Sequence, residues 1–295
     1  MSEVKHHCLI ACRSGNEFIV KCLIEHGADL NKERYDGETP LFIACENGRE
    51  SIVKCLIEHE TDINKEDSDG ETPLFIACEN GSEFIVKYLI EYGADINKEK
   101  SNGVTPLFSA CENGNESIVK YLIEHGADVN KENRWDKTPL FSACQSGNES
   151  IVKYLIEHGA DINKEISDGE TVLFIGCENR RESIVKYIIE HGANVNKENS
   201  DSETLLFSAC HGRNESIVKY LIEHGADVNK ENRWGKTPLF SACQSGNESI
   251  VKYLIKHGAY INKEDSDGET VLFYAREHGN ESIINYLMEQ GARYK

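Results

Sequence analysis

The sequence lacks long apolar runs, an excess of basic residues and a secretory leader pattern. No segment approaches the roughly 18 consecutive apolar residues of a membrane-spanning helix, so we expect no membrane insertion. The formal net charge of −19 has the wrong sign for neutralising phosphates, which argues against nucleic-acid binding. The start, MSEVKHHCLIACRSG, lacks the basic, apolar and small-residue regions of a signal peptide. We therefore expect a cytoplasmic or nuclear protein.

The sequence also lacks the usual signs of an enzyme. It contains no glycine-rich loop that could cradle a phosphate, and no nucleophile–base pair stands outside its repeated pattern. Its eleven cysteines are spread along the whole chain, which favours reduced thiols over a disulfide framework. We predict a non-enzymatic, monomeric protein that uses no cofactor and no metal.

What the sequence does contain is a repeat of 33 residues. A threonine recurs at this interval, at Thr39, Thr72, Thr105, Thr138, Thr171, Thr204, Thr237 and Thr270. Nine repeats fill the chain, of which the first is degenerate and the last is short: 1–33, 34–66, 67–99, 100–132, 133–165, 166–198, 199–231, 232–264 and 265–295. Because no linker separates them, we predict a single quasi-one-dimensional domain over residues 1–295.

Each repeat is predicted to form a hairpin loop followed by two short helices. In the fourth repeat, Gly103 suits a turn, Thr105 suits an N-cap, and Pro106 suits the first helical position. Asn115 is predicted to cap the second helix, and Gly126 to end it. Short helix pairs bury their apolar faces only by stacking. The expected fold is therefore an all-α solenoid of stacked helix-turn-helix repeats joined by hairpin loops.

The repeated words resemble those of the ankyrin-repeat family across essentially the whole chain. The resemblance rests on DGETPLFIACENG (Asp36–Gly48) and IVKYLIEHGADIN (Ile151–Asn163). It implies a protein–protein interaction module, whose hairpin tips and exposed first-helix side form a concave partner-binding surface. One departure is that phenylalanine replaces the histidine of the family's TPLH motif, so we expect ring packing between repeats. The positions are Phe42, Phe75, Phe108, Phe141, Phe174, Phe207, Phe240 and Phe273.

The five residues at each hairpin tip vary most and therefore carry the functional information. The tips 133–137 (NRWDK) and 232–236 (NRWGK) are basic and hold the only two tryptophans, whereas five of the other six tips are acidic. Tryptophan and arginine are enriched at binding hot spots. In the same two repeats Gln-Ser replaces the usual Glu-Asn of the first helix. The predicted partner-binding residues are Tyr35, Arg134, Trp135, Lys137, Gln145, Ser146, Arg233, Trp234, Lys236, Gln244 and Ser245.

Other interpretations of these features stay open. The segments 133–165 and 232–264 differ at only three positions, so duplication of a three-repeat block also explains the second tryptophan. The chain could act as a spacer or spring-like scaffold without a tight ligand. It could also be the substrate of a hydroxylase, since certain asparagines resemble those modified in ankyrin repeats. They are Asn31, Asn64, Asn97, Asn130, Asn163, Asn196, Asn229 and Asn262.

Cysteine and histidine recur in phase, which favours core or structural positions over metal sites. Equivalent histidines in neighbouring repeats cannot converge on one ion. The best zinc candidate is His6-His7-Cys8 with Cys12, yet the repeat frame places both cysteines in the core. Cys22 and Cys55 stand where later repeats have tyrosine, and we expect core positions there as well.

The sixth and seventh repeats are expected to be the least stable. Arg180 and Arg213 replace the glycine between the two helices, which costs about 1–3 kcal/mol if φ is positive. Gly176 replaces an alanine within a helix, and Ser202 replaces the tip glycine. We therefore predict faster amide exchange over 166–231 than in the neighbouring repeats.

Overall fold

The computed structural model describes residues 2–293, with side chains from residue 8 onward. The described residues form paired helices joined by loops, and isolated bridges such as Glu198–Thr204 are their only β structure. They divide into two compact parts, an N-terminal half ending at Ala160 and a C-terminal half beginning at Asp161. The boundary between the two halves falls inside the fifth repeat.

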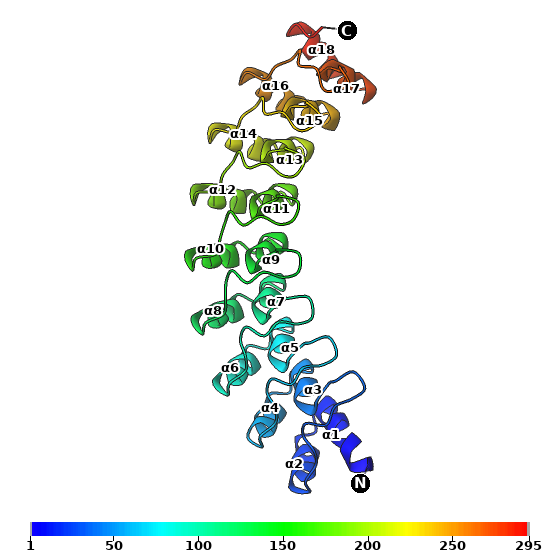
Figure 1. Cartoon of the computed structure of the whole chain (residues 1–295), viewed down its shortest axis with the longest axis vertical. Helices are drawn as coiled ribbons and strands as arrows, with labels where there is room; N and C mark the ends of the chain where they lie inside the picture. The colour runs from blue at the N-terminus through cyan, green and yellow to red at the C-terminus, as the bar shows by residue number, and fades with distance from the viewer. Residues whose placement is uncertain (1, 294–295) are drawn as a thin grey trace. The chain divides into compact units, whose positions relative to one another are not determined.

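In the N-terminal half, the first helices of successive repeats pack on one another, and each second helix packs on its own first helix (Figure 1). The first helices are α1 (Ser2–Ser14), α3 (Pro40–Glu46), α5 (Pro73–Glu79), α7 (Pro106–Glu112) and α9 (Pro139–Ser146). The second helices are α2 (Glu17–Glu25), α4 (Glu50–Ile57), α6 (Glu83–Glu91), α8 (Glu116–Glu124) and α10 (Glu149–Glu157).

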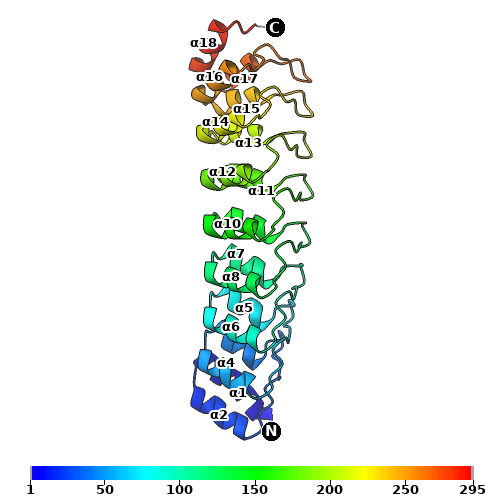
Figure 2. The same cartoon turned by 90° about the vertical axis from the view of Figure 1, so that its left-hand side faces the viewer.

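The C-terminal half repeats this arrangement, and within each half the hairpin loops project from one side (Figure 2). The first helices are α11 (Val172–Glu178), α13 (Leu205–His211), α15 (Pro238–Ser245) and α17 (Val271–Glu277). The second helices are α12 (Glu182–Glu190), α14 (Glu215–Glu223), α16 (Glu248–Lys256) and α18 (Glu281–Glu289). The predicted all-α helix-turn-helix solenoid is confirmed.

From the second repeat onward, each first helix begins directly after the repeated threonine. Thr39 is extended, and its Oγ1 accepts a hydrogen bond from the N–H of Phe42 at 3.3 Å. Pro40 then occupies the first helical position, where its missing N–H removes no helical hydrogen bond. Threonine and proline together therefore fix where the helix starts.

The second helices begin after a residue that often also ties neighbouring repeats together. Asn148 caps α10, because its Oδ1 accepts a hydrogen bond from the N–H of Ile151 at 3.2 Å. Asn115 takes the N-cap position of α8 as predicted, but its Nδ2 donates to the carbonyl of Cys78 at 2.9 Å. Gly126 follows α8 with φ of 96°, so the predicted helix stop is confirmed.

The core of each half consists of the apolar sides of the helix pairs. Seven phenylalanines of the repeated series, from Phe42 to Phe240, are at most 4% exposed. Phe273 in the last repeat is 41% exposed. Within this core, the hydroxyls of Thr138, Thr204 and Thr237 are buried without a hydrogen-bond partner. Each such group costs about 1–3 kcal/mol.

Side-chain hydrogen bonds tie each repeat to the next through the asparagine that follows the second helix. The Oδ1 of Asn97 accepts from the N–H of Asp128 at 2.8 Å, and its Nδ2 donates to the carbonyl of Gly126 at 3.0 Å. Asn64 and Asn229 make the same two bonds to their following repeats. These amides therefore hold the next repeat in place.

The cysteines are free thiols, and all except Cys22 are buried. The thiolate is the reactive form of cysteine. Burial raises the pKa of Cys144 to about 12. At pH 8 this group is therefore a thiolate only about one part in ten thousand of the time.

We predict that the first-helix thiols do not react with a thiol-specific reagent at pH 8 in the native state. These are Cys12, Cys45, Cys78, Cys111, Cys144, Cys177, Cys210 and Cys243. Their labelling should require unfolding, whereas the half-buried Cys22 should be labelled first. Mass spectrometry of labelled peptides, with and without denaturant, measures this. Rapid native labelling of the eight would contradict the packing described above.

Three of the five described non-glycine residues with positive φ lie in the sixth and seventh repeats, and the other two are Glu60 and Asp136. Arg180 and Arg213 have φ of 55° and 57°, where the other repeats have glycine between the helices. Ser202 has φ of 59° at a hairpin tip. A side chain in this left-handed region costs about 1–3 kcal/mol. The lower stability expected for these two repeats depends on positive φ at Arg180 and Arg213, and both residues have it.

Candidate partner-binding grooves

Trp135 lies on a hairpin tip whose backbone is braced by hydrogen bonds within the tip and to the preceding tip. The N–H groups of Trp135 and Lys137 donate to Oδ1 of Asn133 at 3.0 and 3.1 Å. The N–H of Arg134 donates to the carbonyl of Asn102 in the preceding tip at 3.0 Å. The Trp135 side chain is 56% exposed. A braced tip that presents an exposed aromatic ring loses little conformational entropy on binding.

A groove of about 450 Å³ runs between this tip, the tip of the fourth repeat and the helices α5, α7 and α9. We call it the Trp135 groove. Four predicted site residues line it, namely Trp135, Lys137, Gln145 and Ser146. The structure therefore brings the tip and the first helix of the fifth repeat together in one hollow. The other lining residues are Phe75, Glu79, Lys100, Asn102, Val104, Phe108, Ser109, Glu112, Asn113, Asn133 and Ser142.

Val104 and Lys100 of the fourth repeat also line the groove. Val104 packs on the buried ring of Phe75 and its neighbours. The ammonium of Lys100 lies 4.5 Å from the centre of the Phe75 ring and 2.8 Å from Oε1 of Glu71. The lysine stem thus covers apolar surface while its charge stays at the rim.

A second groove, of about 440 Å³, lies among α11, α13 and α15 of the C-terminal half. We call it the Gln244 groove. Every residue that lines it stands 99 positions after a residue that lines the Trp135 groove, so the two grooves are twins. The lining residues are Glu178, Glu203, Phe207, Ser208, His211, Gly212, Ser241 and Gln244.

The tryptophan tip beside the Gln244 groove is engaged with its own neighbours. Arg233 pairs with Asp201 at 3.0 Å, and its guanidinium carbon lies 4.4 Å from the centre of the Trp234 ring. The ammonium of Lys236 lies 4.4 Å from the centre of the Tyr274 ring. Trp234 is 41% exposed and is not among the residues that line the groove. The twin tips are therefore not equivalent.

The walls of the twin grooves also differ in charge. Lys100 and Val104 of the Trp135 groove correspond to Asn199 and Glu203 in the C-terminal half. Glu203 accepts a hydrogen bond from Nδ2 of Asn232 at 2.8 Å, so its carboxylate is fixed at the wall. A third pair differs in the opposite sense, because Glu112 corresponds to His211. The lining of the Trp135 groove carries two lysines and two glutamates, whereas that of the Gln244 groove carries two glutamates and no lysine, so the Gln244 groove is more acidic.

The remaining predicted site residues occupy different environments. Ser245 is 8% exposed, and its hydroxyl donates to the carbonyl of Cys210 at 3.1 Å. It is a structural residue, and we remove it from the candidate surface. Ser146 makes the equivalent bond to the carbonyl of Cys111 at 3.2 Å, although it also lines the Trp135 groove. Tyr35 is 93% exposed, on the tip of the second repeat and outside both grooves.

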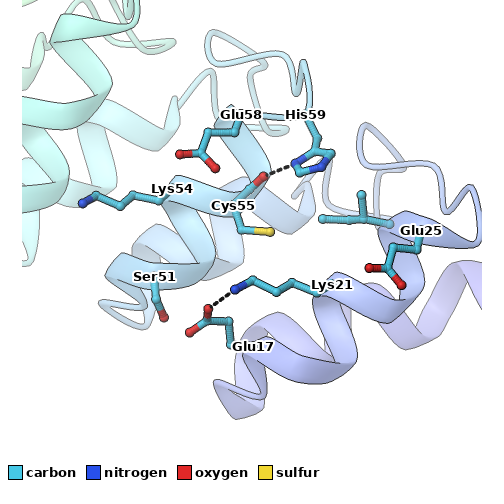
Figure 3. A pocket seen from close by; sticks show the side chains of 9 residues that line it. Glu17, Lys21, Glu25, Ser51, Lys54, Cys55, Glu58 and His59 are labelled. Carbon is cyan, nitrogen blue, oxygen red and sulfur yellow. Dashed lines mark hydrogen bonds and ion pairs between the residues drawn. The ribbon is translucent and has the colours of Figure 1, made fainter.

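Sequence reasoning missed a third hollow, of about 380 Å³, between α2 and α4 on the side of the second helices (Figure 3). Cys55 lines it and is itself only 6% exposed. The available signal was the cysteine itself, which stands where Tyr88 and Tyr121 stand in later repeats. We call this feature the Cys55 hollow.

Among the side chains that the structure describes, no three His, Cys, Asp or Glu residues are grouped so that they could hold a metal ion. The side chains of His6 and His7, part of the zinc candidate, lie outside the described residues. None of the described helices is both long enough and apolar enough to cross a bilayer.

Comparison with known proteins identifies the repeat. A family model described as ankyrin repeats (3 copies) matches residues 8–100, 97–166, 163–232 and 229–295. A search of curated proteins found no significant match. The matches follow one another from residue 8 to residue 295, over the paired helices described above. The chain belongs to the ankyrin-repeat family.

Proposed function

We propose that this chain is a non-enzymatic module that binds a partner protein in the Trp135 groove. Ankyrin repeats are generally protein–protein interaction modules, and their family is generally non-enzymatic. The observation that carries the proposal is that Trp135, Lys137, Gln145 and Ser146 line one groove beside a braced tip. All four belong to a repeat that departs from its neighbours at these positions.

The chemistry of the groove indicates the kind of segment that fits it. Trp135 and Val104 offer apolar contact, Lys137 offers positive charge, and Lys100 offers an ammonium that is paired with Glu71. Glu79 and Glu112 supply negative charge on the helix side. The best complement is a segment with an apolar anchor and a neutral or acidic flank, because rim charges mainly set association rate and partner choice. The more acidic Gln244 groove fits such a segment less well.

The test uses the twin groove as a source of substitutions that the fold already accommodates. The double variant Lys100→Asn, Val104→Glu gives the Trp135 groove the residues of its twin, Asn199 and Glu203. We expect it to weaken partner binding by about ten-fold, because it removes a rim cation and adds a carboxylate. The partner is first obtained by affinity capture from cells that express the protein, under reducing conditions, and the affinity is then measured by calorimetry.

The reverse double variant, Asn199→Lys, Glu203→Val, is the matched control. It gives the Gln244 groove the lysine and the valine that stand at the equivalent positions of the Trp135 groove. We expect the affinity for the partner to be unchanged. A stronger loss in the control than in the Trp135 groove variant would contradict the assignment. Retention of no protein at all would instead favour a spacer or spring-like scaffold.

A further inference from the structure

The second helices carry a repeated tyrosine, and in two repeats its side chain makes three defined contacts. In the fifth repeat, the Tyr154 ring stacks on the ring of His158, with the ring centres 3.9 Å apart. The ammonium of Lys120, from the preceding repeat, lies 5.6 Å from the centre of the Tyr154 ring. The Tyr154 hydroxyl donates to Oε1 of Glu124, also from the preceding repeat, at 3.4 Å. A lysine, a histidine and a glutamate thus surround one phenolic ring.

The C-terminal half contains the same arrangement. The Tyr220 ring stacks on His224 with the ring centres 3.9 Å apart, and the ammonium of Lys186 lies 5.4 Å from the Tyr220 ring centre. The Tyr220 hydroxyl donates to Oε1 of Glu190 at 3.1 Å. In both repeats the lysine stands 34 residues before the tyrosine, the glutamate stands 30 residues before it, and the histidine stands four residues after it. The lysine and histidine contacts also recur at Tyr121 and Tyr253.

At the second repeat the ring is missing but its three partners remain. Cys55 stands at the tyrosine position, and Lys21, Glu25 and His59 stand at the three spacings. All three line the Cys55 hollow, as Figure 3 shows. The hollow of about 380 Å³ therefore lies where the other repeats hold a phenolic ring.

Lys21 and His59 make the same polar contacts as the lysine and the histidine that surround a tyrosine in later repeats. Lys21 pairs with Glu17 at 2.6 Å, and Nδ1 of His59 lies 2.7 Å from the carbonyl oxygen of Cys55. The lysine and the histidine around Tyr154 are held by the same two interactions, at 2.6 and 2.8 Å. The hollow is therefore arranged for a ring before any ring enters.

We propose that the Cys55 hollow binds a phenolic ring, namely a tyrosine side chain presented by a partner protein. The ring stacks on His59 and lies under the Lys21 ammonium, which is attracted to the negative face of an aromatic ring. The phenolic hydroxyl donates to the carboxylate of Glu25. Phenylalanine lacks this hydroxyl and binds less well. This site lies on the second helices, apart from the Trp135 groove, and the proposal does not depend on the function proposed above.

The test is a titration of the whole chain with 4-methylphenol, the side-chain analogue of tyrosine. We expect saturable NMR shifts at amides of α2 and α4, with a Kd on the order of millimolar, given the size of this ligand. Cys55→Tyr fills the hollow with the side chain that later repeats carry, and we expect it to abolish these shifts. Cys55→Ser keeps the hollow open, and we expect it to retain them.

A second pair of measurements distinguishes the contribution of the ring to binding from that of the hydroxyl. These measurements do not require the Cys55→Tyr variant to fold. Glu25 is exposed, so Glu25→Ala leaves the core intact. We expect this change to weaken 4-methylphenol about five-fold and to leave toluene unchanged. Equal binding of 4-methylphenol to Cys55→Tyr and wild type would overturn the proposal, as would an absence of saturable shifts at α2 and α4.

Discussion

Replacing both Arg180 and Arg213 by glycine is expected to raise the free energy of unfolding by about 1–4 kcal/mol in total. Both residues have positive φ, at 55° and 57°, which costs a side-chain-bearing residue about 1–3 kcal/mol. Glycine relieves this strain but also gains entropy in the unfolded chain, which offsets about 0.4–1 kcal/mol at each site. The remaining difference is stabilising.

Denaturant unfolding followed by circular dichroism measures this change. The matched control is Gly279→Ala, at the same point of the last repeat, where φ is 66° and no atom lies within 4 Å of an added Cβ. That change should lower stability by about 1 kcal/mol, because it creates the strain that the arginines carry. A loss of stability in the arginine variant would show that these side chains contribute more than their backbone strain costs.

Hydrogen exchange locates the effect within the array. Stability in repeat proteins is roughly a sum of local and nearest-neighbour terms. Amides of 166–231 should therefore exchange faster than those of 232–264 in the wild type. The double variant Arg180→Gly, Arg213→Gly should reduce this difference in exchange rate. Both segments lie in the C-terminal half.

Most of the fold could be predicted from the sequence because one period governs it. The 33-residue interval, with Thr39 and Pro40 at a helix start and Gly126 at a helix end, determines the local structure directly. The cap of α8 was harder to predict, because Asn115 donates to the preceding repeat instead of capping its own helix. A single repeat does not reveal which neighbour competes for a polar side chain.

The candidate site could be predicted only in part, for the same reason. The sequence predicts the same binding role for Trp135 and Trp234, because their repeats are nearly identical. Their environments differ because Asp201 and Tyr274, which belong to adjacent repeats, engage the second tip. Ser245 was assigned to the surface from its variation, although its hydroxyl is buried against the preceding repeat.

Replacing Trp135 by alanine is expected to weaken partner binding by about 30-fold or more. The indole is 56% exposed in the free protein, lines the groove and stands on a braced backbone, which are the features of a hot-spot side chain. Truncating such a residue costs 2 kcal/mol or more. Trp234→Ala should change the affinity by less than about three-fold, because this indole lies against Arg233 and is not among the residues lining its groove.

The ratio of these two affinities tests the central claim most directly. The captured partner is titrated by calorimetry into wild type, Trp135→Ala and Trp234→Ala, with circular dichroism confirming that all three are folded. A loss confined to Trp135→Ala would support the Trp135 groove as the binding site. Equal losses in both variants, or a loss confined to Trp234→Ala, would contradict it.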